Sequence, residues 1–92
     1  MTVGLRVKGE LRKYFGAEAL QISLADSATL ADLLAAVGER WGGTLPAHLW
    51  DATAGCFRGP VVLMRDKTAV RDPQTRLLDG QEISLFKVLV GG

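Results

Sequence analysis

Residues 29–41 read TLADLLAAVGERW, and this stretch carries the clearest structural pattern in the chain. Its large apolar side chains fall at helical spacing and form one stripe, made of Leu30, Leu33, Leu34, Val37 and Trp41. Thr29 stands at the N-cap position, and Asp32 follows at the spacing of a capping-box partner. Gly42-Gly43 then supplies a stop. The stretch therefore predicts a single amphipathic helix with one buried face.

Two alternating segments precede the predicted helix. Residues 3–8 (VGLRVK) and 20–24 (LQISL) alternate apolar side chains with polar residues or glycine, which is the period of a strand with one buried face. The segment between them, residues 9–16, is too long for a two-residue turn. Its large apolar side chains are expected to fold this loop back onto the sheet edge, and they are Leu11, Tyr14 and Phe15.

Shorter elements follow the helix. Residues 61–64 (VVLM) read as an apolar strand, and residues 68–71 read as a weak returning strand after a turn at 65–67. Residues 44–50 are expected to form one helical turn, because a proline stands near its start, and residues 51–59 read as a loop. Asp79-Gly80 is a turn signal, and the last strand runs from about Glu82.

The order of these elements predicts an α+β fold. A hairpin, one helix and further strands are typical of a mixed sheet, here of four to five strands, with the helix packed across one face. The helix also allows the first and last strands to lie parallel and central. Residues 1–92 are expected to form one domain, with an exposed C-terminal tail from about residue 87.

Composition excludes several classes of function. The net charge is only +1, from 11 basic and 10 acidic residues, so no strong field favours nucleic acid as a partner. No apolar run has the length of a membrane span and no signal peptide opens the chain, so no membrane partner is expected. The lone Cys56 cannot form an internal disulfide, which fits a reducing cytoplasm.

The sequence ends in Gly91-Gly92, directly after the last predicted strand. Glycine allows a backbone to approach another surface closely. Two glycines and a terminal carboxylate would form a thin thread that enters a channel too narrow for side chains. We therefore expect Gly92 to be the reacting residue of this chain.

No catalytic constellation emerges from the sequence. A nucleophile needs a base and an orienting group, and the single histidine and single cysteine give no such set. We expect His48 on the surface and Cys56 as an incidental half-buried thiol. Metal ligands at zinc spacing and a phosphate-binding glycine loop are both missing. The sequence predicts a protein substrate and not an enzyme, with no metal and no bound cofactor.

Several segments resemble the ubiquitin-like β-grasp sulfur carriers, the family of the molybdopterin synthase small subunit and the thiamine sulfur carrier. Residues 29–34 (TLADLL) resemble the family's helix start, and 78–83 (LDGQEI) resemble its turn into the last strand. Residues 86–92 (FKVLVGG) are similar to the tail of the thiamine carriers. The longer middle, residues 51–62, is more similar to the branch of cysteine-biosynthesis carriers and archaeal small modifiers.

The resemblance implies a mechanism. An adenylating enzyme of the ubiquitin-activating type would activate the Gly92 carboxylate with ATP and magnesium. A sulfur donor would then displace AMP and leave a thiocarboxylate. The carrier would pass this sulfur to an acceptor biosynthetic enzyme for molybdopterin or tungstopterin, thiazole, cysteine or thiolated tRNA.

The residues before Gly92 are expected to bind these partners. They are Phe86, Val88, Leu89, Val90 and Gly91. Alternation places Phe86, Val88 and Val90 on one side of the last strand. Two interpretations stay open for Phe86, which is either a core residue or part of an exposed apolar patch that docks on partners.

Two other functions stay open. The same activated carboxylate would serve a ubiquitin-like modifier that is joined through Gly92 to lysines of target proteins. Alternatively, the chain is a β-grasp interaction module in which the glycine pair has no role.

Overall fold

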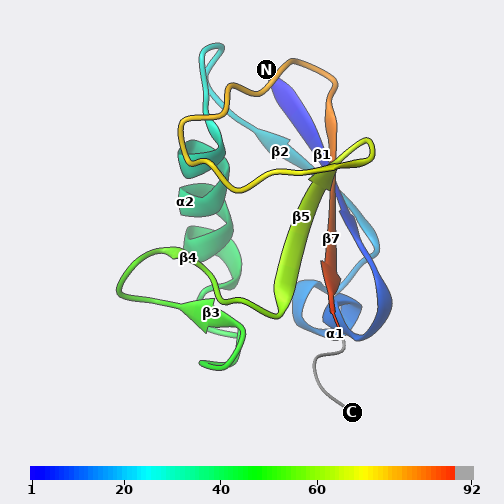
Figure 1. The fold of residues 1–92 in the computed structure, drawn as a ribbon, viewed down its shortest axis with the longest axis vertical. Coiled ribbons are helices and arrows are strands. Elements are labelled where there is room, and N and C mark those ends of the chain that lie inside the picture. Colours follow the sequence, from blue (N-terminus) through cyan, green and yellow to red (C-terminus); the bar gives the residue numbers. More distant parts are fainter. Residues whose placement is uncertain (89–92) are drawn as a thin grey trace.

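The last strand, β7 (Glu82–Lys87), lies in the middle of a mixed sheet (Figure 1). The structure is a computed structural model and describes residues 1–88. The sheet has five strands in the order β2-β1-β7-β5-β6. The other four strands are β1 (Thr2–Val7), β2 (Ala19–Ser23), β5 (Val61–Arg65) and β6 (Thr68–Ala69). β7 runs parallel to β1 and antiparallel to β5, so the predicted parallel pairing of first and last strands is confirmed.

One long helix, α2 (Leu30–Trp41), crosses one face of the sheet (Figure 1). Its bounds match the prediction, and the capping box is present, with the Thr29 N–H donating to Asp32 Oδ2 at 2.9 Å. The next two amides of the helix donate to carbonyls of the loop before β7, those of Thr75 and Pro73. The loop before β7 therefore holds the start of α2 in place.

The core lies between α2 and the inward side of the sheet. In the predicted stripe the four residues from Leu30 to Val37 are buried and Trp41 is half-buried. Alternate residues of β1 and β7 are buried as well. Fully buried side chains, each with less than 2% of its surface exposed, are Leu5, Leu11, Leu30, Leu33, Leu49, Ile83, Leu85, Val3, Val7 and Val37.

The segment between β1 and β2 folds back as predicted, but it packs into the core and not onto the sheet edge, and Tyr14 is only half-buried. It forms a 3-10 turn, η1 (Gly9–Leu11), and a short helix, α1 (Arg12–Phe15). Leu11 and Phe15 are buried, and the Phe15 ring lies 4.9 Å from that of Trp41. The sequence analysis did not predict the helix α1, because so short a helix depends on this packing.

The prediction of a loop over residues 51–59 was wrong in part. Two short strands, β3 (Trp50–Asp51) and β4 (Cys56–Phe57), form a hairpin below α2 (Figure 1). Residues 46–50 make the expected single turn, in which the Leu49 and Trp50 amides both donate to the Pro46 carbonyl. The Trp50 and Phe57 rings meet edge to face at 4.8 Å, which ties the hairpin together.

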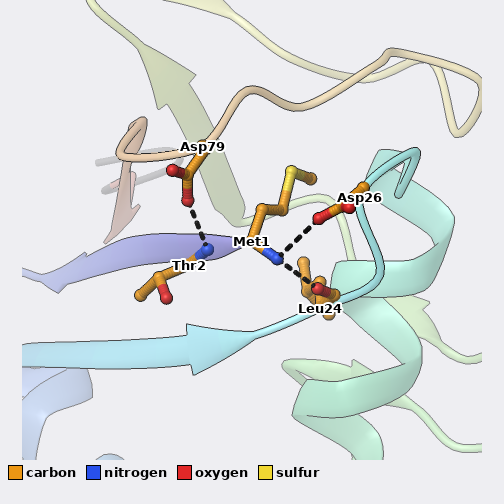
Figure 2. Close-up of polar contacts among 5 residues, drawn as sticks. All are labelled: Met1, Thr2, Leu24, Asp26 and Asp79. Carbon is orange, nitrogen blue, oxygen red and sulfur yellow. Dashed lines mark hydrogen bonds and ion pairs between the residues drawn. The ribbon is translucent and has the colours of Figure 1, made fainter.

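The start of β1 is fixed from both sides (Figure 2). The Met1 nitrogen donates to the Leu24 carbonyl at 2.7 Å and to Asp26 Oδ1 at 3.2 Å. The Thr2 N–H donates to Asp79 Oδ1 at 2.7 Å. These bonds link β1 to the end of β2 and to the turn before β7, and they lie at the opposite end of the sheet from Lys87. Within residues 1–88, the helices all lack the length and apolar character needed to cross a membrane.

Candidate functional site

The two faces of β7 have different surroundings. Ile83 and Leu85 point toward α2 and are fully buried. Phe86 pairs with Val62 of β5, so both lie on the sheet face that α2 leaves open (Figure 1). The alternation predicted for the last strand is therefore present up to the end of β7.

The C-terminal end of β7 is anchored by backbone and side-chain contacts. The Lys8 N–H donates to the Leu85 carbonyl at 2.9 Å, and the Val88 N–H donates to the Pro60 carbonyl at 2.7 Å. Lys87 Nζ lies 2.8 Å from Glu10 Oε1, which makes an ion pair between β7 and η1. The sheet thus holds the chain as far as Val88.

This contact lowers the pKa of the Glu10 carboxylate. The hydrogen bond from Lys87, together with its positive charge, holds the pKa of Glu10 below its ordinary value of 4.5. Glu10 therefore carries its negative charge at neutral pH and restrains Lys87 next to the start of the predicted tail. Both side chains remain partly exposed.

An apolar patch lies on the open face beside this end of β7. We define it as Val62, Met64, Phe86 and Val88. The first three are half-buried, and Val88 is 39% exposed. None of the four packs against the core cluster, whereas Leu63, between two of them, does. Phe86 is therefore no core residue. That it docks on partners stays a prediction.

Two members of the patch were missed from the sequence. Residues 61–64 are all apolar, and such a run indicates a strand buried on both faces. The structure instead buries Val61 and leaves Val62 and Met64 half-exposed on the open face. The sequence predicts only one helix, and one helix can cover only one face of a sheet. Alternate residues of this apolar strand were therefore bound to lie on the uncovered face.

Two exposed ion pairs involve arginines of β1 and α1. Arg6 lies opposite Ser84 on the open face, and its Nε is 3.2 Å from the Glu82 carboxylate. Arg12 pairs with Glu18 at 3.3 Å. All four side chains are about half exposed or more, so these ion pairs contribute little stability.

The structure places the predicted site residues in two groups. Phe86 and Val88 belong to the apolar patch, whereas Leu89, Val90, Gly91 and Gly92 lie outside the described residues. His48 is exposed, and Cys56 is half-buried in β4. No group of three or more potential metal ligands occurs in the part of the chain that the structure describes. The described site can present a surface and a strand end to a partner.

Comparison with solved structures finds the same fold in small proteins of similar length. SAMP1 from Haloferax volcanii superposes with a TM-score of 0.81 at 18% identity, with 100% of both chains covered. A chain of the complex of subunits 1 and 2 of molybdopterin-converting factor from Helicobacter pylori gives 0.65 at 25% identity, again with 100% of both covered. A chain of the Amycolatopsis orientalis BexX/CysO complex gives 0.68 at 19% identity, covering 98% of this chain and 99% of that one.

A search of curated proteins finds no match to this chain. The five-stranded sheet and single crossing helix nevertheless agree with these structures over nearly every residue. The ThiS family model matches residues 5–92, and the protein is therefore a member of the ThiS family, with the β-grasp fold of ubiquitin-like sulfur carriers and modifiers.

Proposed function

We propose that this protein is a sulfur carrier that is activated at the Gly92 carboxylate. A partner enzyme of the ubiquitin-activating type would use ATP and magnesium to join AMP to that carboxylate, with pyrophosphate as the leaving group. A sulfur nucleophile at the oxidation level of sulfide would then displace AMP and leave a thiocarboxylate. In this role the protein is a co-substrate, and its partners supply the catalytic groups.

The position of β7 is the observation that carries the proposal. β7 is paired on both sides, and the backbone is bound as far as Val88. A paired strand would give a partner enzyme a fixed starting point for the residues that follow it in the sequence, Leu89-Val90-Gly91-Gly92. Since glycine has no side chain, nothing would obstruct attack at the acyl carbon. The family match also extends to residue 92.

The apolar patch supplies a docking surface for this delivery. Val62, Met64, Phe86 and Val88 lie on the open face beside the strand end, so a partner that covers them would stand next to the residues that follow. Two of the similar structures are complexes with another protein, which supports an acceptor enzyme or activating enzyme as the occupant.

Intact mass and C-terminal peptide sequencing test the proposal. Protein isolated from its own cells is expected to contain a form in which one oxygen of Gly92 is replaced by sulfur. Gly92→Ala and deletion of Gly92 should abolish this form. Gly43→Ala is the matched control, because a methyl group there meets no atom within 4 Å. A Gly92-deleted protein that still gained sulfur would contradict the proposal.

A second function is favoured by the similarity to SAMP1, which belongs to the small archaeal modifier proteins. In that case the activated Gly92 would form an isopeptide bond with lysines of target proteins. The same peptide sequencing separates the two functions, since a modifier would leave Gly92 branched onto lysine. A terminus that shows neither form would favour an interaction module.

A further inference from the structure

The strand β2 forms an open edge of the sheet. It lies outermost in the strand order, beside β1 (Figure 1). Within residues 1–88, no strand other than β1 pairs with it. All five of its residues are opposite a residue of β1, so the side of β2 that faces away from β1 is available along the whole strand.

The pairing with β1 determines which backbone groups face this edge. The Leu24 N–H donates to the Met1 carbonyl at 2.8 Å. Hydrogen-bonding groups alternate between the two sides of a strand, so the even-numbered residues of β2 bond to β1. The N–H and C=O groups of Ala19, Gln21 and Ser23 therefore point outward. No backbone hydrogen bond within residues 1–88 uses them.

This edge lacks the features that usually prevent strand pairing. Edge strands are commonly protected by charged side chains, proline or a very short length. The sequence of β2 is ALQIS, without a charged residue or a proline. The opposite edge is protected, because β6 has only two residues and follows a turn that contains Asp66 and Lys67. The sheet can therefore be extended at β2 and not at β6.

The side chains of β2 follow a pattern that reads the same from both ends. Small residues, Ala19 and Ser23, stand at the two ends. The branched apolar residues Leu20 and Ile22 come next, and Gln21 is central. A two-fold interface needs a surface that is complementary to itself. β2 meets this condition, because an antiparallel copy would place small opposite small and apolar opposite apolar.

We infer that two copies of this chain pair through their β2 edges, antiparallel and centred on Gln21. Gln21 then lies opposite Gln21 of the second copy, and Ala19 lies opposite Ser23 of the second copy. These are hydrogen-bonded pairs, because the outward groups belong to the odd-numbered residues. Any other antiparallel register leaves at least one of the three outward residues without a partner in the other β2.

The side chains also match across this register. Leu20 lies opposite Ile22 of the second copy on the side of the sheet that α2 covers. Leu20 is only half-buried there, so the second copy would cover more of its apolar surface. On the open face the two Gln21 side chains lie opposite each other. An amide is both a donor and an acceptor, so they can bond to one another.

The arrangement leaves the proposed functional surfaces accessible. A two-fold axis perpendicular to the sheet reverses the direction of every strand in the second copy. The two β7 strands therefore run in opposite directions, and their ends at Val88 lie at opposite ends of the joined sheet. β1 separates β2 from β7 in each copy, so the apolar patch lies outside the interface.

The association closes at two copies and is weak. Each copy uses its one extendable edge, so no further copy can add. A standard interface has about 20–30 residues a side, whereas β2 has five residues. The dimer is accordingly expected to form at high protein concentration.

Backbone NMR of the full chain from about 0.05 to 1 mM tests the inference, since this range detects weak association. The amides of Ala19, Gln21 and Ser23 should shift with concentration and become protected from hydrogen exchange. The amides of Leu20 and Ile22 bond to β1 and should be protected at every concentration. In a mixed labelled and unlabelled sample, a contact between the α-protons of Leu20 and Ile22 from different copies would establish the register.

Charge substitutions at the two-fold axis provide a second test. Gln21→Lys should weaken association about fivefold or more, because like charges directly opposite each other are destabilising. Gln21→Glu should act in the same way. Gln21 is exposed, so both variants should fold. An equal mixture of the two should associate more tightly than either alone, because opposite charges then meet. Thr68→Lys, at an exposed position of β6, is the matched control and should change association less than about twofold.

Three results would overturn the inference. Spectra that are independent of concentration up to about 1 mM would show that the edge does not bind a second copy, and would leave it to the strand of another protein. Shifts confined to the apolar patch would place the contact elsewhere. Unchanged association of Gln21→Lys, or no gain on mixing it with Gln21→Glu, would exclude the two-fold register.

The inference is separate from the chemistry proposed at Gly92. Gly92→Ala should leave the association unchanged, because residue 92 follows β7 and not β2 in the sequence. Gln21→Lys should in turn leave sulfur loading of Gly92 unchanged. Each proposal can therefore fail without the other.

Discussion

At the scale of single residues, Gly38 shows a conflict between helix propensity, which disfavours glycine, and packing, which requires a small residue. Glycine inside a helix destabilises it by about 1 kcal/mol relative to alanine. Gly38 nevertheless lies inside α2, where a Cβ atom would stand 3.0 Å from Cζ2 of Trp50. Trp50 is buried and its ring is held by Phe57. The small residue allows the β3–β4 hairpin to approach the helix.

Gly38→Ala is therefore expected to destabilise the protein despite the gain in helix propensity. Overpacking costs about 1–3 kcal/mol, against a propensity gain of about 1 kcal/mol, so the free energy of unfolding should fall by about 1 kcal/mol. Urea unfolding measures the change. In a Trp50→Leu background the same substitution should become stabilising. Stabilisation by Gly38→Ala with Trp50 present would show that the contact has no cost.

The Glu10–Lys87 pair predicts a pH dependence. The pKa of Glu10 is lower in the folded protein than its ordinary value of 4.5. Such a group stabilises the fold above pH 4.5, and the contribution is lost as pH falls through the lowered pKa. Glu10→Gln should therefore be less stable than the parent at pH 7 and equal to it at strongly acidic pH. Urea midpoints between pH 2 and pH 7 measure this, and a constant difference across the range would contradict it.

At the scale of elements, α2 was predictable because local signals agree. The apolar stripe, the Thr29–Asp32 capping box and the following glycines all indicate the same helix, and its observed bounds are Leu30–Trp41. The β3–β4 hairpin was not predictable in this way. Its strands have two residues each, and they depend on the contact between Trp50 and Phe57, which only the folded chain brings together. Length and periodicity decide which elements a sequence reveals.

Removal of the capping box tests how much the start of α2 depends on local contacts. Asp32→Ala removes the acceptor of the Thr29 N–H and should lower the free energy of unfolding by about 1 kcal/mol. Glu39→Ala, in the last turn of α2, is the control and should be neutral or slightly stabilising, since a negative charge near a helix C-terminus is unfavourable. A neutral Asp32→Ala would indicate that the Thr75 and Pro73 carbonyls suffice to hold the helix start.

At the scale of the whole molecule, three surface features lie around β5 and β7. The apolar patch is on the open face, a groove lined by residues of α2, β4 and β5 lies beside β5, and the strand end at Val88 leads to the residues expected to react. Part of this arrangement could be read from the sequence, because Phe86 and Val88 alternate with buried residues of the last strand. The groove could not, because its walls come from α2, β4, β5 and the loop after β6, and only the tertiary fold brings them together.

The separation of these surfaces predicts that docking and folding can be altered independently. Val88→Glu places a charge in the apolar patch at a residue that is 39% exposed, so the fold should tolerate it. If the patch docks the activating enzyme, a buried charge without a partner would weaken the complex. Adenylation of Gly92 should then lose at least about tenfold in kcat/KM, mainly through KM, because docking is lost and the chemistry is unchanged.

Ser23→Glu is the matched control for that experiment. Ser23 lies on β2, at the far edge of the same sheet and at the end opposite Val88, so a charge there should leave KM unchanged. Phe86→Glu should act as Val88→Glu does, with some loss of stability because Phe86 is half-buried. Adenylation kinetics of Val88→Glu that match the parent would exclude the patch as the docking surface. A fall in kcat alone would instead indicate that Val88 acts through the path of the chain toward Gly92.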